Sequence, residues 1–152
     1  MIKKLNYFFQ AFIIYLIFFI GRILGIKISR KLFSHIFCLI GPIFKSRKII
    51  IINIKIFTTN ISDAEIKGIT DSMWRNYGKT FIEYIFLDYF RKNNNHIEII
   101  GLNNISEQIE GGKPVIFVSG HFANFELMSM EITKKNINLA TIYRPLNNFF
   151  LN

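Results

Sequence analysis

The first third of the chain consists of long apolar runs, with no regular alternation of apolar and polar positions. Leu5 to Gly21 carries no charged residue. A helix that spans a bilayer needs about 20 apolar residues, so this run is of borderline length. No small-residue cleavage site of a signal peptide follows it, and Arg22 stands there instead. We predict that residues 1–21 form a retained membrane anchor; the alternative is a helix buried in a core.

Basic residues are concentrated after this apolar run. Residues 22–60 contain eight Lys and Arg, whereas only Lys3 and Lys4 precede the run. If the anchor spans a bilayer, the positive-inside rule places the body of the protein in the cytoplasm. We interpret residues 22–60 as a basic membrane-proximal segment. Its Ile-rich stretch, Lys48 to Phe57, fits a helix and a strand equally well.

The next segment has the signature of a long amphipathic helix. Ser62 and Glu65 have the spacing of a capping box, in which a polar N-cap is followed three residues later by an acidic residue. From Ile66 to Ile85, apolar residues recur at helical spacing. We therefore predict a helix that starts after Ser62 and buries its aromatic stripe in a core.

Short apolar runs alternate with helical patterns in the rest of the chain. We predict, in order, a strand at His96–Ile100, a helix at Leu102–Glu110, a strand at Pro114–Val118, a helix from Phe125 to about Lys134 and a strand at Asn138–Tyr143. A β-α-β-α-β order is typical of an α/β layer with parallel strands. The predicted fold class is therefore α/β, preceded by the anchor helix and a helical segment.

The composition narrows the choice of partners. The chain carries 19 Lys+Arg against 10 Asp+Glu, which indicates anionic partners such as phospholipid head groups, phosphorylated substrates or acidic proteins. The basic residues are spread out and no nucleic-acid-binding module is visible, so we expect no nucleic acid. Cys38 is the only cysteine, which excludes a disulfide within the chain and a cysteine-based metal site.

The candidate chemistry lies between the predicted strand that ends at Val118 and the helix after it. A histidine at the carboxyl end of a strand occupies the position where open α/β sheets bind ligands, and a neutral imidazole is a general base near neutral pH. His121 can meet Glu126 only if the histidine is in the loop and the glutamate is in the first helical turn. Gly120 permits the sharp turn and Asn124 is a good N-cap. The pair favours acyl transfer to an alcohol, although chance spacing remains an alternative.

Three blocks in this order resemble one enzyme family. Ser119–Glu126 resembles the His-x4-Asp/Glu block of the lipid A biosynthesis lauroyl/myristoyl acyltransferases. Met73–Lys79 resembles the helix that precedes the domain in that family, and Ile142–Asn148 resembles its aromatic-Arg-Pro block. The block departs mildly from the family pattern, with Ala123 where Gly is usual and Phe125 where Trp is usual.

The resemblance implies a specific reaction and place. Such enzymes move a fatty acyl group from acyl carrier protein, the co-substrate, to a hydroxyl of a lipid A precursor in lipopolysaccharide biosynthesis. They work at the cytoplasmic face of the bacterial inner membrane, in contact with membrane lipid, and need no metal or other cofactor. By position, His121 would be the general base and Glu126 its partner, while Arg144 and Asn124 would bind substrate; an arginine can hold a phosphate by bidentate hydrogen bonds.

Family members continue past the Arg-Pro block. The resemblance therefore implies that residues 61–152 are the N-terminal part of an α/β acyltransferase domain that looks truncated, with a separately encoded C-terminal half as one expectation. The alternatives are an inactive membrane-bound remnant, half of a split acyltransferase, or a glycerolipid acyltransferase. The last ranks lower because the block of that family usually has Asp in place of Glu126.

Overall fold

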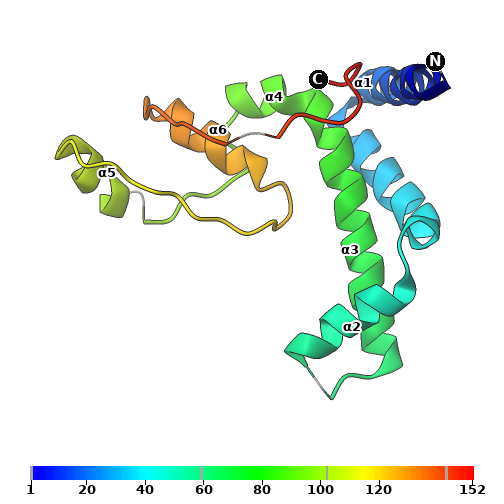
Figure 1. Cartoon of the computed structure of the whole chain (residues 1–152). Helices are drawn as coiled ribbons and strands as arrows, with labels where there is room; N and C mark the ends of the chain where they lie inside the picture. Colours follow the sequence, from blue (N-terminus) through cyan, green and yellow to red (C-terminus); the bar gives the residue numbers. More distant parts are fainter. Residues whose placement is uncertain (1, 59, 102, 143) are drawn as a thin grey trace. The chain divides into compact units, whose positions relative to one another are not determined.

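A computed structural model describes residues 2–58, 60–101, 103–142 and 144–152. The chain forms two compact units, Met1–Phe86 with Leu146–Asn152 and Leu87–Pro145. The helices of the first unit are α1 (Ile2–Phe44), α2 (Arg47–Phe57), α3 (Asp63–Glu83) and the short 3-10 helix η1 (Tyr84–Phe86); those of the second are α4 (Leu87–Lys92), α5 (Asn103–Glu110) and α6 (Glu126–Lys134) (Figure 1).

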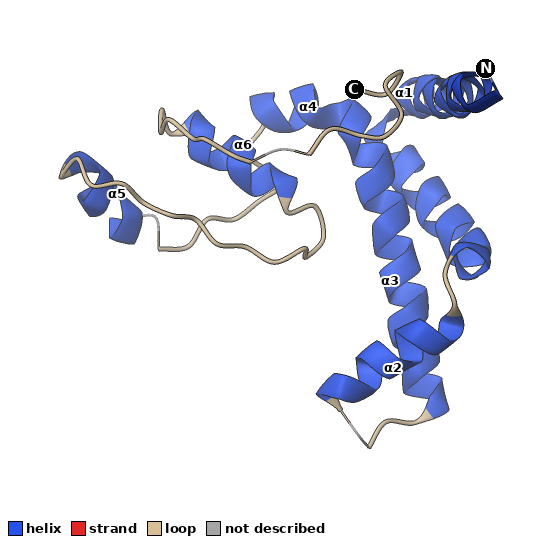
Figure 2. Ribbon diagram, viewed as in Figure 1, coloured by secondary structure: helices blue, strands red, loops and turns tan. Residues whose placement is uncertain are grey.

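The prediction of a β-α-β-α-β layer is wrong. The two helices of that pattern are present as α5 and α6, but the described parts of the three predicted strands run as loops (Figure 2). Leu102 and Tyr143, at the edges of two predicted elements, lie outside the described residues. A strand exists only when a partner supplies its hydrogen bonds, whereas a helix makes its own. The Ile and Val side chains that suggested strands are largely open to solvent here, for example Ile116 at 89% and Val118 at 90%.

α1 contains a sharp break at Gly25. The backbone there has φ 74° and ψ 164°, a region that is open only to glycine. The Ser29 hydroxyl donates a hydrogen bond of 2.7 Å to the Gly21 carbonyl and so closes the break with a side chain. Ser29 is fully buried, so this bond also satisfies a polar group in the core. The break divides α1 into an apolar first part and a second part that lies along α3 (Figure 1).

The second part of α1 packs closely against α3 because α3 carries a glycine at the contact. A methyl group at Gly78 would overlap the Phe33 backbone carbonyl. The Phe81 ring lies 5.3 Å from that of Phe37 and 6.2 Å from that of Phe33, measured between ring centroids. Ile82 of α3 is completely buried and lies beside Gly21, just before the break in α1. This interface forms the main core of the first unit.

Two polar features fix the ends of α3. The predicted capping box is confirmed: the Glu65 backbone N–H donates to the Ser62 hydroxyl at 3.3 Å, and the Ser62 N–H donates to the Glu65 carboxylate at 2.9 Å. The hydrogen bonds from Ser62 hold the pKa of Glu65 below its usual value. At the other end, Arg30 Nε lies 2.9 Å from Glu83 Oε1, and this ion pair compensates a carboxylate whose side chain is only 8% exposed.

Residues 146–152 fold back onto the first part of α1. The Asn148 amide donates a hydrogen bond of 2.8 Å to the Tyr7 carbonyl, and the Tyr15 hydroxyl donates one of 2.8 Å to the Phe150 carbonyl. Edge-on ring contacts join Tyr7 to Phe149 and Phe8 to Phe150. Hydrogen bonds at Asn148 and Phe150 and ring contacts of Phe149 and Phe150 therefore hold this segment on α1.

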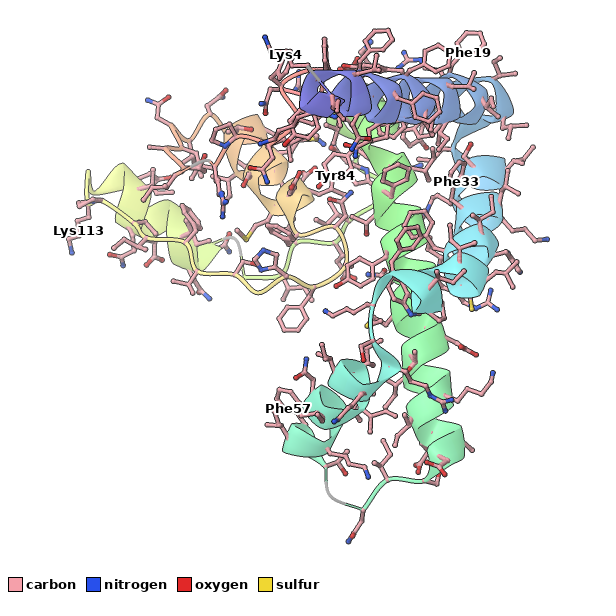
Figure 3. The ribbon with its side chains drawn as sticks, turned by 45° about the vertical axis from the view of Figure 1, so that its right-hand side comes forward. Lys4, Phe19, Phe33, Phe57, Tyr84 and Lys113 are labelled. Atoms are coloured by element: carbon pink, nitrogen blue, oxygen red, sulfur yellow. The ribbon has the colours of Figure 1, made fainter. Side chains whose placement is uncertain are left out.

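Most of the remaining surface of this first part of α1 is apolar and open. Phe19, labelled in Figure 3, is 65% exposed, and Phe9 and Phe12 are 60% and 58% exposed. α1 is the one described helix that is long and apolar enough to cross a membrane, and its most apolar 18-residue window is only 11% buried. A helix in the core of a soluble protein would be mostly buried, so this exposure favours membrane anchoring.

Candidate functional site

The predicted site lies in the second unit, in the loop that leads into α6. The Phe122 N–H donates a hydrogen bond of 2.9 Å to the Gly120 carbonyl, which makes His121 the central residue of a tight three-residue turn. Ala123 follows with a left-handed φ of 46°. A methyl group at Gly120 would overlap the Phe122 ring. A side chain at this position would have to displace the exposed Phe122 ring, and the turn presents His121 at its tip.

His121 is exposed and rests on an aromatic side chain. Its ring centroid lies 4.3 Å from that of Phe125, with the two planes inclined by 53°. Phe125 is the N-cap residue of α6, and Glu126 is the first residue of that helix. The imidazole thus lies near the N-terminus of α6, which carries partial positive charge and favours an anionic group nearby.

The N-cap assignment of Asn124 is wrong. Phe125 holds that position, in a right-handed helical conformation and without a side-chain capping bond. The helix is entered through a tighter turn instead, in which the Asn124 carbonyl accepts from the Leu127 N–H at 3.2 Å and the Phe125 carbonyl accepts from the Met128 N–H at 3.1 Å. Asn124 is half-buried, whereas Glu126 is exposed.

The structure brings three of the four predicted site residues to one junction. His121 and Asn124 lie in the loop and Glu126 opens the helix, as the spacing argument requires. Arg144 is exposed in the segment that follows α6, in the same unit. The pairing of His121 with Glu126 and the substrate contacts of Asn124 and Arg144 stay predictions.

Sequence reasoning missed a buried polar cluster behind this junction. His96 Nε2 lies 3.3 Å from Glu131 Oε1, and Lys134 Nζ lies 2.7 Å from the same oxygen. Lys134 also donates to the Phe90 carbonyl at 2.7 Å and the Asn93 carbonyl at 3.2 Å. The cluster ties α6 to the end of α4 and so fixes the helix that begins at Glu126. The i, i+3 spacing of Glu131 and Lys134 signals their pairing, but nothing local signals His96.

The family model of bacterial lipid A biosynthesis acyltransferases matches residues 2–152. The chain belongs to this family. Separate comparisons with curated proteins and with solved structures gave no match. Membership makes the protein an acyltransferase of lipid A biosynthesis, and it implies a lipid A precursor as substrate.

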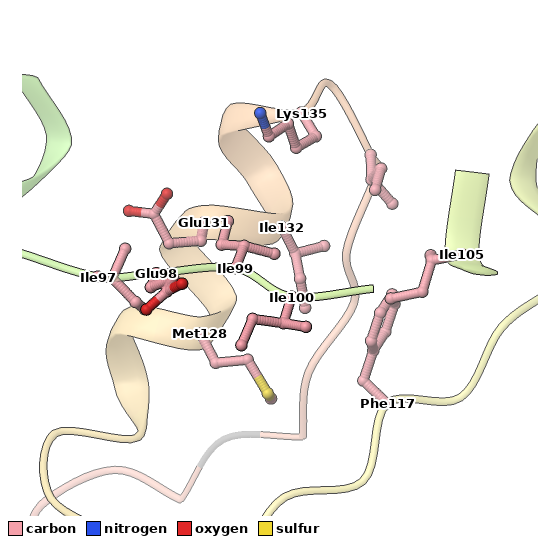
Figure 4. A pocket seen from close by; sticks show the side chains of 11 residues that line it. Ile97, Glu98, Ile99, Ile100, Ile105, Phe117, Met128, Glu131, Ile132 and Lys135 are labelled. Atoms are coloured by element: carbon pink, nitrogen blue, oxygen red, sulfur yellow. The ribbon is translucent and has the colours of Figure 1, made fainter. Parts of the chain in front are cut away.

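A lipid A acyltransferase must accommodate fatty acyl chains, and the second unit contains an apolar cavity of about 310 Å³. Its wall includes Met128 and Ile132 of α6, Phe117 and the Ile97–Ile100 segment (Figure 4). Lys135, Glu98 and Glu131 contribute charged groups to the same lining. The volume lies at the lower end of the range of small-molecule sites, which is about 300–1,000 Å³.

The part of the chain that the structure describes contains no group of three or more His, Cys, Asp or Glu that could hold a metal ion. The three histidines occupy separate environments. His35 Nδ1 lies 2.7 Å from the Lys31 carbonyl on α1, His96 packs against Phe90, and His121 alone is at the turn before α6. Of the three, His121 is the one that lies at the junction with the other predicted site residues.

Proposed function

We infer that this lipid A acyltransferase takes its fatty acyl group from acyl carrier protein and that His121 is the general base. One observation carries the assignment: the exposed imidazole at the tip of a tight turn, directly before the N-terminus of α6, in a chain of this family. An exposed imidazole is accessible to a substrate hydroxyl, and it is the side chain most often used for proton transfer near neutral pH.

The proposed reaction is a direct acyl transfer. His121 removes the proton from a hydroxyl of the lipid A precursor while the hydroxyl oxygen attacks the thioester carbonyl of the donor. The carbon–sulfur bond then breaks, and the thiol of the carrier protein leaves with the proton that the imidazole took up. Glu126 would stabilise the imidazolium and fix its orientation. Asn124 and Arg144 would bind substrate, with Arg144 directed to a phosphate or to the acyl donor.

The apolar cavity supports this proposal. Its aliphatic wall suits an acyl chain, and α6 contributes both Glu126 at its first turn and Met128 and Ile132 to the lining. An acyl chain bound there would lie against the same helix whose N-terminus carries the proposed reacting groups. No metal or other cofactor takes part in the proposed step.

The proposed location is the cytoplasmic face of the bacterial inner membrane, with α1 as the anchor. The exposed apolar surface of α1 supports membrane attachment. The basic residues within 22–60, which follow the apolar first part of α1, support the orientation, because Lys and Arg accumulate on the cytoplasmic side of an anchor. The positive net charge also suits an acidic carrier protein and a phosphorylated lipid.

The test uses membranes that contain the full chain, supplied with acyl carrier protein thioesters and a lipid A precursor, with products read by mass spectrometry. We expect one added acyl mass, and a loss of roughly 10²- to 10⁴-fold in its rate for His121→Ala, because general bases contribute about that much. His35→Ala is the matched control and should keep the rate. Turnover retained in His121→Ala would refute the base assignment.

Two further arms separate the alternatives. A glycerol phosphate acceptor replaces the lipid A precursor in one arm, and acylation only there would favour a glycerolipid acyltransferase. In the other, the helical circular dichroism of the protein is recorded in parallel. A folded, membrane-bound chain that acylates neither acceptor would overturn the proposal and support an inactive remnant or half-enzyme.

A further inference from the structure

α2 is apolar on two opposite faces, and only one of them is packed. Ile50 is 5% exposed and faces the rest of the first unit. Ile49, Ile52 and Ile56, which we call the outer stripe, are 49%, 51% and 73% exposed. Their i, i+3, i+7 spacing places them on one face of the helix. A continuous apolar stripe on an outer helix face is uncommon in a soluble protein unless something binds it.

Two lysines border the outer stripe. Lys48 lies four residues before Ile52 and Lys55 three residues after it, so both are helical neighbours of that side chain. Both lysines are exposed, and neither has an ion pair with any residue that the structure describes. Long lysine stems can lie along apolar surface while their charged ends reach a polar layer above it. The edge of the stripe is therefore cationic.

The charge around α2 has one sign. Residues 1–62 contain ten Lys and Arg and no Asp or Glu, whereas residues 63–152 contain nine Lys and Arg and ten Asp and Glu. The whole positive excess of the protein thus lies in the part that includes α1 and α2. A surface of this kind is complementary to an anionic one, and each Lys or Arg near an anionic bilayer strengthens the attraction.

The outer stripe also continues the apolar surface of α1. Leu39, Ile43 and Phe44, just before α2, are 79%, 81% and 78% exposed, and Phe57 at its end is 91% exposed. Both helices belong to the same compact unit. From Leu39 to Phe57 the exposed apolar side chains are interrupted by the basic Lys45–Lys48 corner, and further back on α1 by the exposed Arg22, Lys27, Arg30 and Lys31. These charged interruptions are all basic, so the surface that leads from α1 to α2 stays complementary to an anionic bilayer.

We propose that α2 lies in the plane of the membrane interface, with the outer stripe in the acyl–head-group boundary and Lys48 and Lys55 at the phosphates of anionic phospholipids. This is a second attachment, beyond the anchor in α1. α2 has features of an interfacial helix: an outward apolar stripe, two lysines along one edge of it and no acidic residue. Attachment at two helices restricts the rotation of the first unit about the anchor.

The test requires a local probe, because α1 holds the chain in any vesicle. In a Cys38→Ser background, Ile52→Cys carries an environment-sensitive NBD fluorophore, and Ser72→Cys on α3 carries the same fluorophore as the matched control. The full chain is reconstituted into vesicles of phosphatidylcholine alone or of equal parts phosphatidylcholine and phosphatidylglycerol, with doxyl-labelled lipid as the quencher. We expect blue-shifted, lipid-quenched emission at position 52 in the anionic vesicles and aqueous emission at position 72.

The lysines provide the second comparison. In anionic vesicles Lys48→Gln with Lys55→Gln should lower the docked-to-undocked ratio of the position-52 probe by roughly 30-fold, a factor of about five for each lysine. Aqueous emission at position 52 in anionic vesicles would overturn the proposal. Equal quenching in the lysine variant would refute the role of the charges. Emission that is shielded but not quenched by lipid would point to a second copy of the chain on the stripe and would also overturn the proposal.

Discussion

The two units of the protein contain similar residue types but use them differently. Ile82 in the first unit is 0% exposed, whereas Ile142 in the second is 107% exposed. Of the buried hydrophobic side chains among the described residues, six lie in the first unit and two, Phe90 and Leu127, in the second. The first unit is built from long helices that make their own backbone bonds and then pack. The second consists of short helices joined by loops whose apolar residues have few partners.

This difference shows what decides whether an Ile-rich segment forms regular secondary structure. The backbone hydrogen bonds of a helix join residues four positions apart, so α3 can form from its own sequence. It then needs α1 only as the partner that buries its apolar face. A strand needs a second strand from elsewhere in the chain. The four predictions that follow test this difference through hydrogen exchange and stability, starting with the largest expected effect.

The largest contrast should appear in hydrogen exchange. Amides of α3 should exchange at least roughly a thousand-fold more slowly than those of residues 114–119, because core helices open only by large-scale unfolding while loop amides are open most of the time. Mass spectrometry of peptides from the protein in detergent micelles measures this. α6 is the internal control in the second unit. Equal protection of residues 114–119 and α3 would show that a sheet forms after all.

Truncation of an isoleucine should lower the free energy of unfolding in the first unit but hardly change it in the second. Ile82→Ala should lower the free energy of unfolding by about 2–5 kcal/mol, the range for a buried aliphatic residue that leaves a cavity. Ile142→Ala should change it by less than about 0.5 kcal/mol, as expected for an exposed site. Denaturant unfolding in detergent micelles, followed by circular dichroism, gives both values. A comparable loss in the two variants would contradict the exposed position of Ile142.

The glycines of α3 allow a matched pair. Gly78→Ala should destabilise the protein by about 1–3 kcal/mol, because the added methyl group meets the Phe33 carbonyl and forces the helices apart. Gly68→Ala on the same helix has open space around it and should stabilise the protein by about 0.5–1 kcal/mol. Thermal unfolding of both variants tests the signs. A stabilising Gly78→Ala would show that α1 and α3 are not in contact there.

The smallest effect concerns the start of α3. Ser62→Ala should cost about 0.5–2 kcal/mol through loss of the capping hydrogen bond. Since the folded state holds the pKa of Glu65 below its ordinary value of 4.5, this group stabilises the fold above pH 4.5, and the contribution is lost as the pH falls through the lowered pKa. Unfolding measured as a function of pH should therefore show a weaker acid dependence in Ser62→Ala than in the unmodified protein. An identical dependence would assign the titration to another carboxylate.

Whether a feature could be predicted from the sequence depends on how far apart in the chain the interacting residues are. The capping box at Ser62, the long helix that follows it and the placement of α6 depend on neighbours within one turn, and all three are confirmed. The strands depend on distant partners and were predicted wrongly. Asn124 has the right residue type for an N-cap, but the tight turn at His121 carries the chain one residue further before the helix begins.

Polar contacts between residues far apart in the chain could not be predicted from the sequence. The bond from Asn148 to the Tyr7 carbonyl joins residues 141 positions apart, and no local pattern predicts it. The same is true of the His96–Glu131 contact. His121, Asn124 and Glu126 could be proposed from the sequence because they lie within one block from Ser119 to Glu126, where spacing and family resemblance both apply; Arg144 was proposed from the resemblance alone.

The break at Gly25 sets the length of the straight apolar segment before it. The uncharged run from Leu5 to Gly21, at about 1.5 Å per residue, is roughly 26 Å long, slightly less than the hydrocarbon thickness of an average bilayer, about 30 Å. Such a rod would span a bilayer upright with Lys4 and Arg22 near its two surfaces, and the Gly21–Ser29 bond would hold the corner where the chain leaves it. Hydrophobic matching would then favour membranes whose hydrocarbon layer is about as thick as this run is long. The position of the break in α1 would thus influence in which membrane the protein resides.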